Sequence, residues 1–474
     1  MVATLKTDIC VIGAGSGGLS VAAGASQMGA DTVLIERDKM GGDCLNYGCV
    51  PSKALIAAGH TAHLMRHSDR FGIKSVAPQV DYAKVRDHVR GVIAAIEPND
   101  SVERFTGLGV NVILGAAKFT SPNTVEAGGK TVQAKRFIIA TGSSAMIPPV
   151  LGLDQVKYLT NETVFELDTR PDHLIVIGGG PIGAELAQAH RRLGAEVTIV
   201  EMFNFLGKDD PELTEVVRKQ FALDGINIRA QTAVTAIEKD SDKIVVVTEK
   251  NGQIERITGS HLLVAAGRIP NLDGLNLEAA GVAFKRRGIE VDARLRTTNK
   301  KIFAIGDIAS PYQFTHMAGY HASIVIRNAL FKLPAKVNYS AVPWVTYTDP
   351  ELAHVGKTET DAEKEHPGAI KILRWPFHEN DRAQAERETE GLIKVVTTKK
   401  GRVLGATIAG PRAGELLSPW IMAVGNRQKI GAMAGMIAPY PTLGEVGKRV
   451  AGSYYTPSLF SERTRKIVRF LLKF

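Results

Sequence analysis

Residues 8–18 read DICVIGAGSGG, and this stretch decides the class of fold. The apolar run before Gly13 is typical of a buried strand, and the Ala-rich stretch that follows is typical of a helix. Gly13 permits a tight turn, Gly15 permits a pyrophosphate to approach the backbone, and Gly18 permits close packing of helix on strand. The pattern therefore predicts a strand–turn–helix unit that binds a dinucleotide.

The next predicted strand, residues 32–36, ends at Glu36, where a carboxylate can hold the ribose hydroxyls of a dinucleotide. A second copy of the unit, LIVIGGGPIGAELAQA, occupies residues 174–189, and its second strand ends at Glu201. The glycines of this copy are Gly178, Gly180 and Gly183. The third glycine precedes the acid by 18 residues in both copies, since 36 − 18 and 201 − 183 are equal. Two such units predict two dinucleotides, or one dinucleotide and an evolutionary relic.

Two of the three cysteines lie in residues 41–53, GGDCLNYGCVPSK. On a regular helix the Cα atoms of Cys44 and Cys49 lie roughly 8–9 Å apart, whereas a disulfide needs less than about 7 Å. If the pair bonds, the helix must be interrupted between them, and Gly48 and the following Pro51 permit this.

Cys49 is then expected at a helix N-terminus, where the helix dipole and unpaired amides favour a thiolate. Lys53 lies four residues further on the same helical face and adds positive charge. These features predict a redox dithiol in preference to a structural disulfide or to two buried cysteines. With two nucleotide units beside a dithiol, FAD and a nicotinamide coenzyme are the most economical pair of cofactors.

The stretch at residues 41–53 resembles the active-site signature of the class I pyridine nucleotide–disulfide oxidoreductases, which include dihydrolipoamide dehydrogenase, glutathione reductase and mercuric reductase. The resemblance extends over nearly the whole chain. It implies an α/β fold with two Rossmann-type dinucleotide-binding domains, a C-terminal α+β dimerisation domain and a homodimer. The implied domains are an FAD-binding domain at residues 1–148 and 270–339, an NAD(P)H-binding domain at residues 149–269, and a dimerisation domain at residues 340–474.

The resemblance also implies roles for individual residues. Cys49 is the cysteine beside the flavin, Cys44 is the one that attacks the substrate, and Glu185 pairs with Lys53 near flavin N5. Further FAD contacts are implied at the strand ends IIATGSS and IFAIGDIA, and VAAGRIPN resembles the exit from the nicotinamide domain. The residues selected there are Thr141, Gly142, Gly306, Asp307 (for the ribityl hydroxyls) and Gly267.

Glu201 also bears on the choice of coenzyme. Its carboxylate suits the adenosine 2′-hydroxyl of NAD and repels the 2′-phosphate of NADP. No arginine or lysine lies between Met202 and Gly207 to reverse this preference. We therefore expect NADH in preference to NADPH.

The chain departs from the family in the segment Ala438 to Glu445, where disulfide-processing members carry a histidine that serves the partner subunit as acid–base. Here Tyr440 takes that place, while the family's glutamate is retained as Glu445. A tyrosine with a pKa near 10 is a poor base at neutral pH. Mercuric reductases also carry a tyrosine there, but they add a terminal cysteine pair, and this chain has no cysteine after Cys49.

Several acceptors therefore stay open: a disulfide, a metal ion or a quinone-like compound. The chain can be a dihydrolipoamide dehydrogenase or a mercuric reductase-like metal reductase. The remaining alternative is a redox-sensing flavoprotein that acts as a binding partner. No resident metal site is expected.

The composition sets wider bounds. With 44% hydrophobic and 23% charged residues, the chain resembles an ordinary soluble protein, and three cysteines favour a reducing compartment, here the cytoplasm. The N-terminal residues suggest no targeting segment, and no apolar run is long enough to cross a bilayer. The net charge of +9 comes without a nucleic-acid module, so no nucleic-acid partner is expected.

The last fourteen residues, 461–474, are basic and amphipathic. They suit either a membrane-surface helix, giving peripheral membrane contact, or docking on the chain's own dimer. One short segment rarely anchors a protein alone, which favours docking on the dimer.

Overall fold

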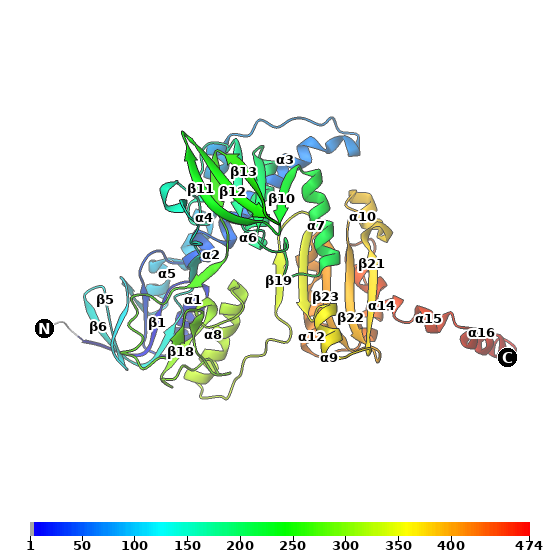
Figure 1. The fold of residues 1–474 in the computed structure, drawn as a ribbon. Helices are drawn as coiled ribbons and strands as arrows, with labels where there is room; N and C mark the ends of the chain where they lie inside the picture. The colour runs from blue at the N-terminus through cyan, green and yellow to red at the C-terminus, as the bar shows by residue number, and fades with distance from the viewer. Residues whose placement is uncertain (1–3) are drawn as a thin grey trace.

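The computed structural model describes residues 4–474 (Figure 1). The first sheet has seven strands in the order β3-β2-β1-β6-β5-β4, and β18 pairs with β6. These strands are β1 (Thr4–Ile12), β2 (Thr32–Glu36), β3 (Val110–Leu114), β4 (Lys118–Ser121), β5 (Thr124–Ala127), β6 (Lys130–Ile139) and β18 (Ile302–Ala304). Strands β1, β2, β3, β6 and β18 pair in parallel, and the others antiparallel. Since β18 is remote in sequence from the other strands, two separate parts of the chain build this sheet.

Helices pack on one face of this sheet, and the dithiol lies on two helices that follow β2 in the chain. Helix α1 (Ser16–Gln27) packs beside α8 (Thr315–Ala329), and α3 (Cys49–Arg66) packs against α6 (Pro181–Arg192) of the second unit. The short α2 (Gly42–Asn46) precedes α3, while α4 (Tyr82–Ile96) and α5 (Val102–Gly107) lead to β3. Residues 9–12 of β1 are at most 3% exposed, because one face of the strand packs with residues of α1 and α8 and the other with residues of β4, β5 and the segment 275–289.

The second unit repeats this design around a four-stranded parallel sheet in the order β10-β9-β8-β14. Its strands are β8 (His173–Ile177), β9 (Glu196–Glu201), β10 (Ile226–Ala230) and β14 (His261–Val264), with α6 and α7 (Pro211–Leu223) as helices. A three-stranded antiparallel sheet rises from it: β11 (Ala233–Asp240), β12 (Lys243–Lys250) and β13 (Gln253–Gly259). The segments that join the two units pair as β7 (Ser143–Ala145) and β15 (Arg268–Pro270).

The C-terminal part is a five-stranded antiparallel sheet in the order β19-β20-β23-β22-β21. Its strands are β19 (Pro343–Thr346), β20 (Glu351–Gly356), β21 (Ile370–Pro376), β22 (Leu392–Thr398) and β23 (Val403–Gly410). Its helices are α9 (Glu359–Glu365), α10 (Asp381–Glu386), α11 (Ala413–Leu416), α12 (Ser418–Gly425), α13 (Ile430–Ala434) and α14 (Glu445–Ser453). Trp420 and Phe377 are fully buried in its core.

Figure 1 shows that the chain then leaves this body through α15 (Thr456–Leu459) and α16 (Glu462–Leu471). The architecture confirms the expected fold class of two Rossmann-type units and a C-terminal α+β domain. No helix within residues 4–474 is both long and apolar enough to cross a membrane.

Candidate functional site

A cavity of about 1480 Å³ runs between the two glycine loops and past the dithiol. It gathers most of the residues that the sequence selected. Those lining it are Gly13, Gly15, Glu36, Cys44, Cys49, Lys53, Thr141, Gly142, Gly178, Gly180, Glu185, Glu201, Gly267, Gly306 and Asp307. Gly18 and Gly183 lie behind the loops, where packing requires a glycine, because an added Cβ would lie 1.8 and 2.0 Å from the carbonyl oxygens of Gly13 and Gly178.

The dithiol spans a break between two helices. Cys44 lies in α2, the chain leaves helical geometry at Tyr47 and Gly48, and Cys49 is the first residue of α3. Both cysteines are free thiols in this structure. The interrupted helix that the spacing of Cys44 and Cys49 requires is therefore present, and it places Cys49 at the N-terminus of an 18-residue helix.

The surroundings of Cys49 favour its thiolate. Its Sγ lies 3.4 Å from Oγ1 of Thr315. The interaction with the Cys44 thiol, followed by Thr315 and the charge of Lys53, lowers the pKa of Cys49 to about 6. The same interaction, with burial, raises the pKa of Cys44 above its ordinary value. At neutral pH the reduced pair therefore holds one thiolate, and it resides on Cys49.

Lys53 and Glu185 form an ion pair beside the thiols. Lys53 Nζ lies 2.7 Å from Oε2 of Glu185, whose side chain is 7% exposed. Oε1 of Glu185 accepts a hydrogen bond from the amide of Tyr347 at 2.9 Å, and Lys53 Nζ lies 4.3 Å from the centroid of the Tyr347 ring. Burial alone would lower the pKa of Lys53, but Glu185 outweighs this and raises it. Lys53 is thus held charged within the cavity, close to Cys49.

The glycine loops fit the phosphates of two dinucleotides. Gly15 and Gly180 are the N-cap residues of α1 and α6, and neither helix has a side-chain cap. A Cβ on Gly180 would meet nothing within 4 Å, and one on Gly15 only Cα of Gly42 at 4.0 Å, so both loops leave room for an anion. Unpaired amides and the helix dipole at such a site favour phosphate.

The two acids have matching contacts. Oε2 of Glu36 accepts a hydrogen bond from the amide of Ala14 at 2.6 Å, and Oε2 of Glu201 accepts one from Gly179 at 2.6 Å. Each acid also accepts an amide hydrogen bond two residues ahead. Each carboxylate is thereby fixed beside its glycine loop, at the position from which it could hold a ribose if a dinucleotide binds there.

Two residues that were not predicted from the sequence, Arg268 and Ser143, link Asp43 with Asp307 in the cavity. Arg268 donates from Nε to Oγ of Ser143 at 2.7 Å and forms an ion pair with Asp43 at 3.1 Å. The Ser143 hydroxyl donates to Oδ2 of Asp307 at 2.6 Å. Burial raises the pKa of Asp307, although Ser143 and Arg268 act against this rise. Arg268 stands directly after Gly267 in the VAAGRIPN stretch, so an arginine within a largely apolar segment was the sign that could have revealed it.

Tyr440 and Glu445 are not brought to this cavity by their own chain. The Tyr440 side chain is 70% exposed, and its hydroxyl donates to Oδ2 of Asp381 at 3.0 Å. This hydrogen bond raises the pKa of Tyr440. Glu445 is the first residue of α14. The role expected of both across the dimer remains a prediction.

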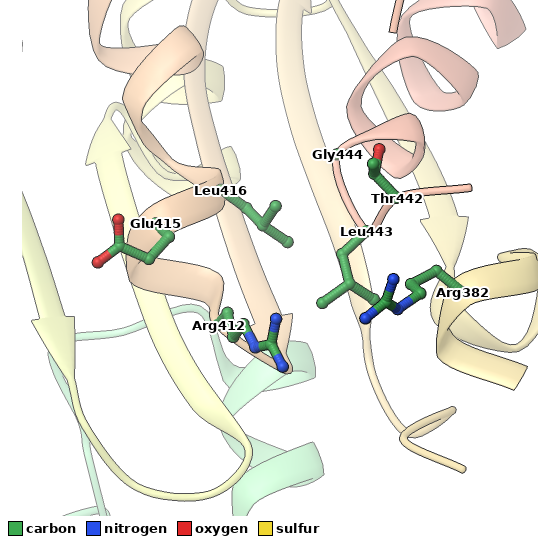
Figure 2. A pocket seen from close by; sticks show the side chains of 7 residues that line it. All are labelled: Arg382, Arg412, Glu415, Leu416, Thr442, Leu443 and Gly444. Carbon is green, nitrogen blue, oxygen red and sulfur yellow. The ribbon is translucent and has the colours of Figure 1, made fainter. Parts of the chain in front are cut away.

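A second, smaller cavity of about 250 Å³ lies in the C-terminal domain, beside the segment 442–444 that follows Tyr440 (Figure 2). It is lined by Arg382, Arg412, Glu415, Leu416, Thr442, Leu443 and Gly444. Residues 4–474 contain no group of three or more His, Cys, Asp or Glu side chains placed to hold a metal ion.

Comparison with known proteins agrees with this geometry. Residues 7–322 match the family model described as pyridine nucleotide-disulphide oxidoreductase, and residues 342–451 match the dimerisation domain of the same family. The mercuric reductase of Bacillus cereus is 38% identical over 92% of this chain and 70% of its own length. The dihydrolipoyl dehydrogenase of Geobacillus stearothermophilus is 35% identical over 94% of this chain and 96% of its own.

Solved structures agree as well. The HOCl-induced flavoprotein disulfide reductase RclA from Escherichia coli, in its Cu(II) complex, matches with a TM-score of 0.85 at 25% identity, over 94% of this chain and 99% of that one. LpdA from Mycobacterium tuberculosis matches with a TM-score of 0.86 at 27% identity, over the same shares of the two chains.

Proposed function

Because the chain belongs to the pyridine nucleotide-disulphide oxidoreductase family, whose members are FAD-dependent enzymes that use a pyridine nucleotide, we propose that it passes electrons from NADH through FAD to the Cys44–Cys49 pair and on to a small acceptor. The observation that supports this most is the position of Cys49 at the N-terminus of α3, in one cavity with both glycine loops. The acceptor is a disulfide, a metal ion or a quinone-like compound.

The residues of the cavity divide the work. The first glycine loop and Glu36 would hold FAD, with Asp307 near its ribityl chain, and the second loop and Glu201 would hold NADH. FAD, when bound, supplies two-electron transfer between the nicotinamide and the dithiol. Lys53, held by Glu185, keeps positive charge beside Cys49 and stabilises its thiolate.

The exchange with a disulfide acceptor can be written from the two thiols. The sulfur of Cys44, after losing its proton, attacks one sulfur of the acceptor and releases the other as a thiolate, which takes up a proton. The Cys49 thiolate then attacks the Cys44 sulfur of the mixed disulfide, re-forming the Cys44–Cys49 disulfide and releasing the second acceptor sulfur as a thiolate, which takes up a proton from solvent. Because the pKa of Cys44 is raised, its deprotonation needs a base.

The proposal is tested by measuring NADH oxidation by the FAD-loaded protein with lipoamide, glutathione disulfide, metal ions and quinones as separate acceptors. Turnover with any of them, together with loss of that turnover when the dithiol is replaced, supports a reductase. Bound flavin with no turnover on the whole panel would contradict the proposal.

Tyr440 predicts which acceptors are slow. Its hydroxyl is engaged by Asp381 and its pKa is raised, so it cannot serve as a base at neutral pH. We expect slow turnover with dihydrolipoamide as electron donor and with glutathione disulfide as acceptor, and faster turnover with acceptors that need no base. Tyr440→His, with Glu445 present to orient the imidazole, is expected to raise dithiol–disulfide turnover at least about tenfold, within the usual contribution of a positioned base.

Steady-state kinetics with NADH and lipoamide on both proteins measure this gain, and Tyr440→Phe serves as the control that removes the hydroxyl without adding a base. Wild-type turnover equal to that of a competent lipoamide dehydrogenase would show that Tyr440 does not slow dithiol–disulfide exchange.

Coenzyme choice is predicted from Glu201. We expect a higher kcat/KM with NADH than with NADPH. Glu201→Gln is expected to lower the ratio of the two kcat/KM values by about ten- to a hundredfold, because one charge-assisted hydrogen bond contributes roughly 1.5–3 kcal/mol. Lys208 also lines the cavity. It lies one residue beyond the segment 202–207, which contains no arginine or lysine that could bind the 2′-phosphate of NADPH. Lys208→Met is therefore the matched variant, expected to affect only NADPH. Wild-type protein that prefers NADPH, with the preference lost in Lys208→Met, would overturn the assignment to Glu201.

A further inference from the structure

The C-terminal helix α16 is amphipathic, and neither of its faces is buried against the rest of the described chain. It begins after Ser461, whose Oγ accepts the amide hydrogen bond of Thr464 at 3.3 Å, and none of its residues is buried. Figure 1 shows α15 and α16 projecting from the C-terminal domain, away from both nucleotide-binding units. The large apolar side chains that stay exposed are Leu459, Phe460, Ile467, Val468, Phe470, Leu471, Leu472 and Phe474. Eight such side chains within sixteen residues form a patch that marks an interaction site.

Charge and apolarity are separated around this helix. At 100° per residue, the helical cations Arg465, Lys466 and Arg469 fall on one side, while Arg463 falls among the apolar residues. The large apolar residues of the helix, Ile467, Val468, Phe470 and Leu471, fall on the other side. A helix with cations along one face and aromatic and branched residues on the opposite face lies in the interface of a lipid bilayer, with its apolar face among the acyl chains.

The net charge decides between a membrane and a second copy of the chain. Residues 461–474 carry five cations and one carboxylate, a net +4 of the chain's +9. A second copy has the same positive charge, so long-range electrostatics oppose docking of this tail on it. An anionic bilayer attracts the same cations, and each is worth about 1 kcal/mol near such a surface.

One weak anchor is marginal, but the dimerisation domain at residues 342–451 supplies two tails to each assembly. Once one tail has bound, the second binds at an effective concentration set by its tether, so two weak sites yield a far tighter overall attachment. We propose that α16 lies on the surface of anionic phospholipid bilayers and that the homodimer is held there by its two tails together.

Vesicle co-sedimentation of the FAD-loaded dimer tests this proposal. The probe vesicles are phosphatidylcholine alone, or phosphatidylcholine mixed with an equal amount of phosphatidylglycerol. The wild-type protein is expected to bind the mixed vesicles and not the neutral ones, and added salt is expected to weaken binding. Deleting residues 461–474 is expected to abolish binding while flavin content, dimerisation and NADH oxidation stay unchanged.

Point variants separate the two faces of α16. Arg465→Glu with Arg469→Glu is expected to weaken binding at least about twentyfold, from about fivefold for each lost cation. Phe470→Asp with Leu471→Asp removes the apolar contact and is expected to abolish binding. Lys239→Glu with Lys243→Glu, both exposed on the β11–β12 hairpin, makes the same charge change elsewhere and is expected to leave binding unchanged.

The contribution of the second tail to vesicle binding can be measured separately. Mixed dimers with one full-length and one tail-deleted chain, isolated with two affinity tags, are expected to bind at least about tenfold more weakly than the wild-type dimer. Equal binding of both dimers would overturn the role of paired tails. Absence of vesicle binding, together with dissociation of the dimer on tail deletion, would instead show that α16 docks on a second copy.

Discussion

Replacing either Cys44 or Cys49 with serine is expected to lower NADH-dependent turnover at least about a thousandfold, because neither variant can close the disulfide that carries the electrons. The two variants should nevertheless differ in spectrum. Cys49 is the thiol whose surroundings hold a thiolate, whereas the pKa of Cys44 is raised. Cys44→Ser is therefore expected to show the long-wavelength absorption of a thiolate beside oxidised flavin even without reductant, and Cys49→Ser to lack it under all conditions.

The pH dependence of this band has a definite sign. The pKa of Cys49 lies near 6 rather than near 9, so its thiolate persists above about pH 6 and is protonated below it. In two-electron-reduced wild-type protein the band is expected to fade as pH falls through about 6. Lys53→Met removes one of the groups that lower this pKa, so the midpoint is expected to rise in that variant.

Cys10 provides a matched control. It is fully buried in β1, and burial raises its pKa, so Cys10→Ala is expected to leave both turnover and the band intact. Absorbance spectra, pH titrations and steady-state rates of the variants are the measurements. If Cys49→Ser retains the band and Cys44→Ser loses it, the two cysteines have the opposite roles.

Much of the nucleotide-binding architecture could be predicted because it is encoded locally. The glycines at residues 13, 15 and 18 and the acid at residue 36 act within one strand–turn–helix–strand unit, so their spacing alone indicates the fold. The interruption between Cys44 and Cys49 was predictable for the same reason, since helix geometry and disulfide geometry conflict at that spacing. The burial of Glu185 also followed from its neighbours, which are small and apolar.

The remaining contacts join residues that are remote in sequence. The backbone amide of Tyr347 donates a hydrogen bond to Glu185, 162 residues away in sequence. Since every residue except proline has such an amide, the residue type could not indicate this contact. Thr315 meets Cys49 across 266 residues, on a helix without a distinctive motif. For Tyr440 the sequence indicated a function at the partner subunit, and this role stays a prediction.

The ion cluster around the buried side chains of Arg192 and Asp224 shows how such contacts hold the parts together. The Arg192 side chain is 5% exposed, and its Nε lies 3.0 Å from Asp224 at the end of α7. Its Nη1 lies 2.7 Å from Asp349 of the C-terminal domain, which also contacts His60 of α3 at 3.3 Å. Three regions of the chain thus meet at one guanidinium, on the same helix as Glu185.

Arg192→Met is therefore expected to lower the free energy of unfolding by about 3–5 kcal/mol, because it leaves the buried Asp224 carboxylate without its cation. Arg229→Met is the matched control: its partner Glu255 lies at 3.0 Å, but both side chains are more than 40% exposed, so the expected loss is at most about 1 kcal/mol. Chemical denaturation of the FAD-loaded proteins measures both. Equal losses in the two variants would show that burial does not set the strength of the Arg192 cluster.

Acidification supplies a second test of the same cluster. Burial alone would raise the pKa of Asp349, but His60 and Arg192 hold it well below its ordinary value of 3.8. A carboxyl whose pKa is lowered by folding stabilises the fold fully above its unfolded pKa and loses that contribution as pH falls toward the folded one. The stability difference between wild type and Arg192→Met is therefore expected to stay constant from pH 7 to about pH 5 and to shrink only below about pH 4. A difference that already disappears near pH 6 would contradict the assignment of this contribution to the Arg192–Asp349 pair.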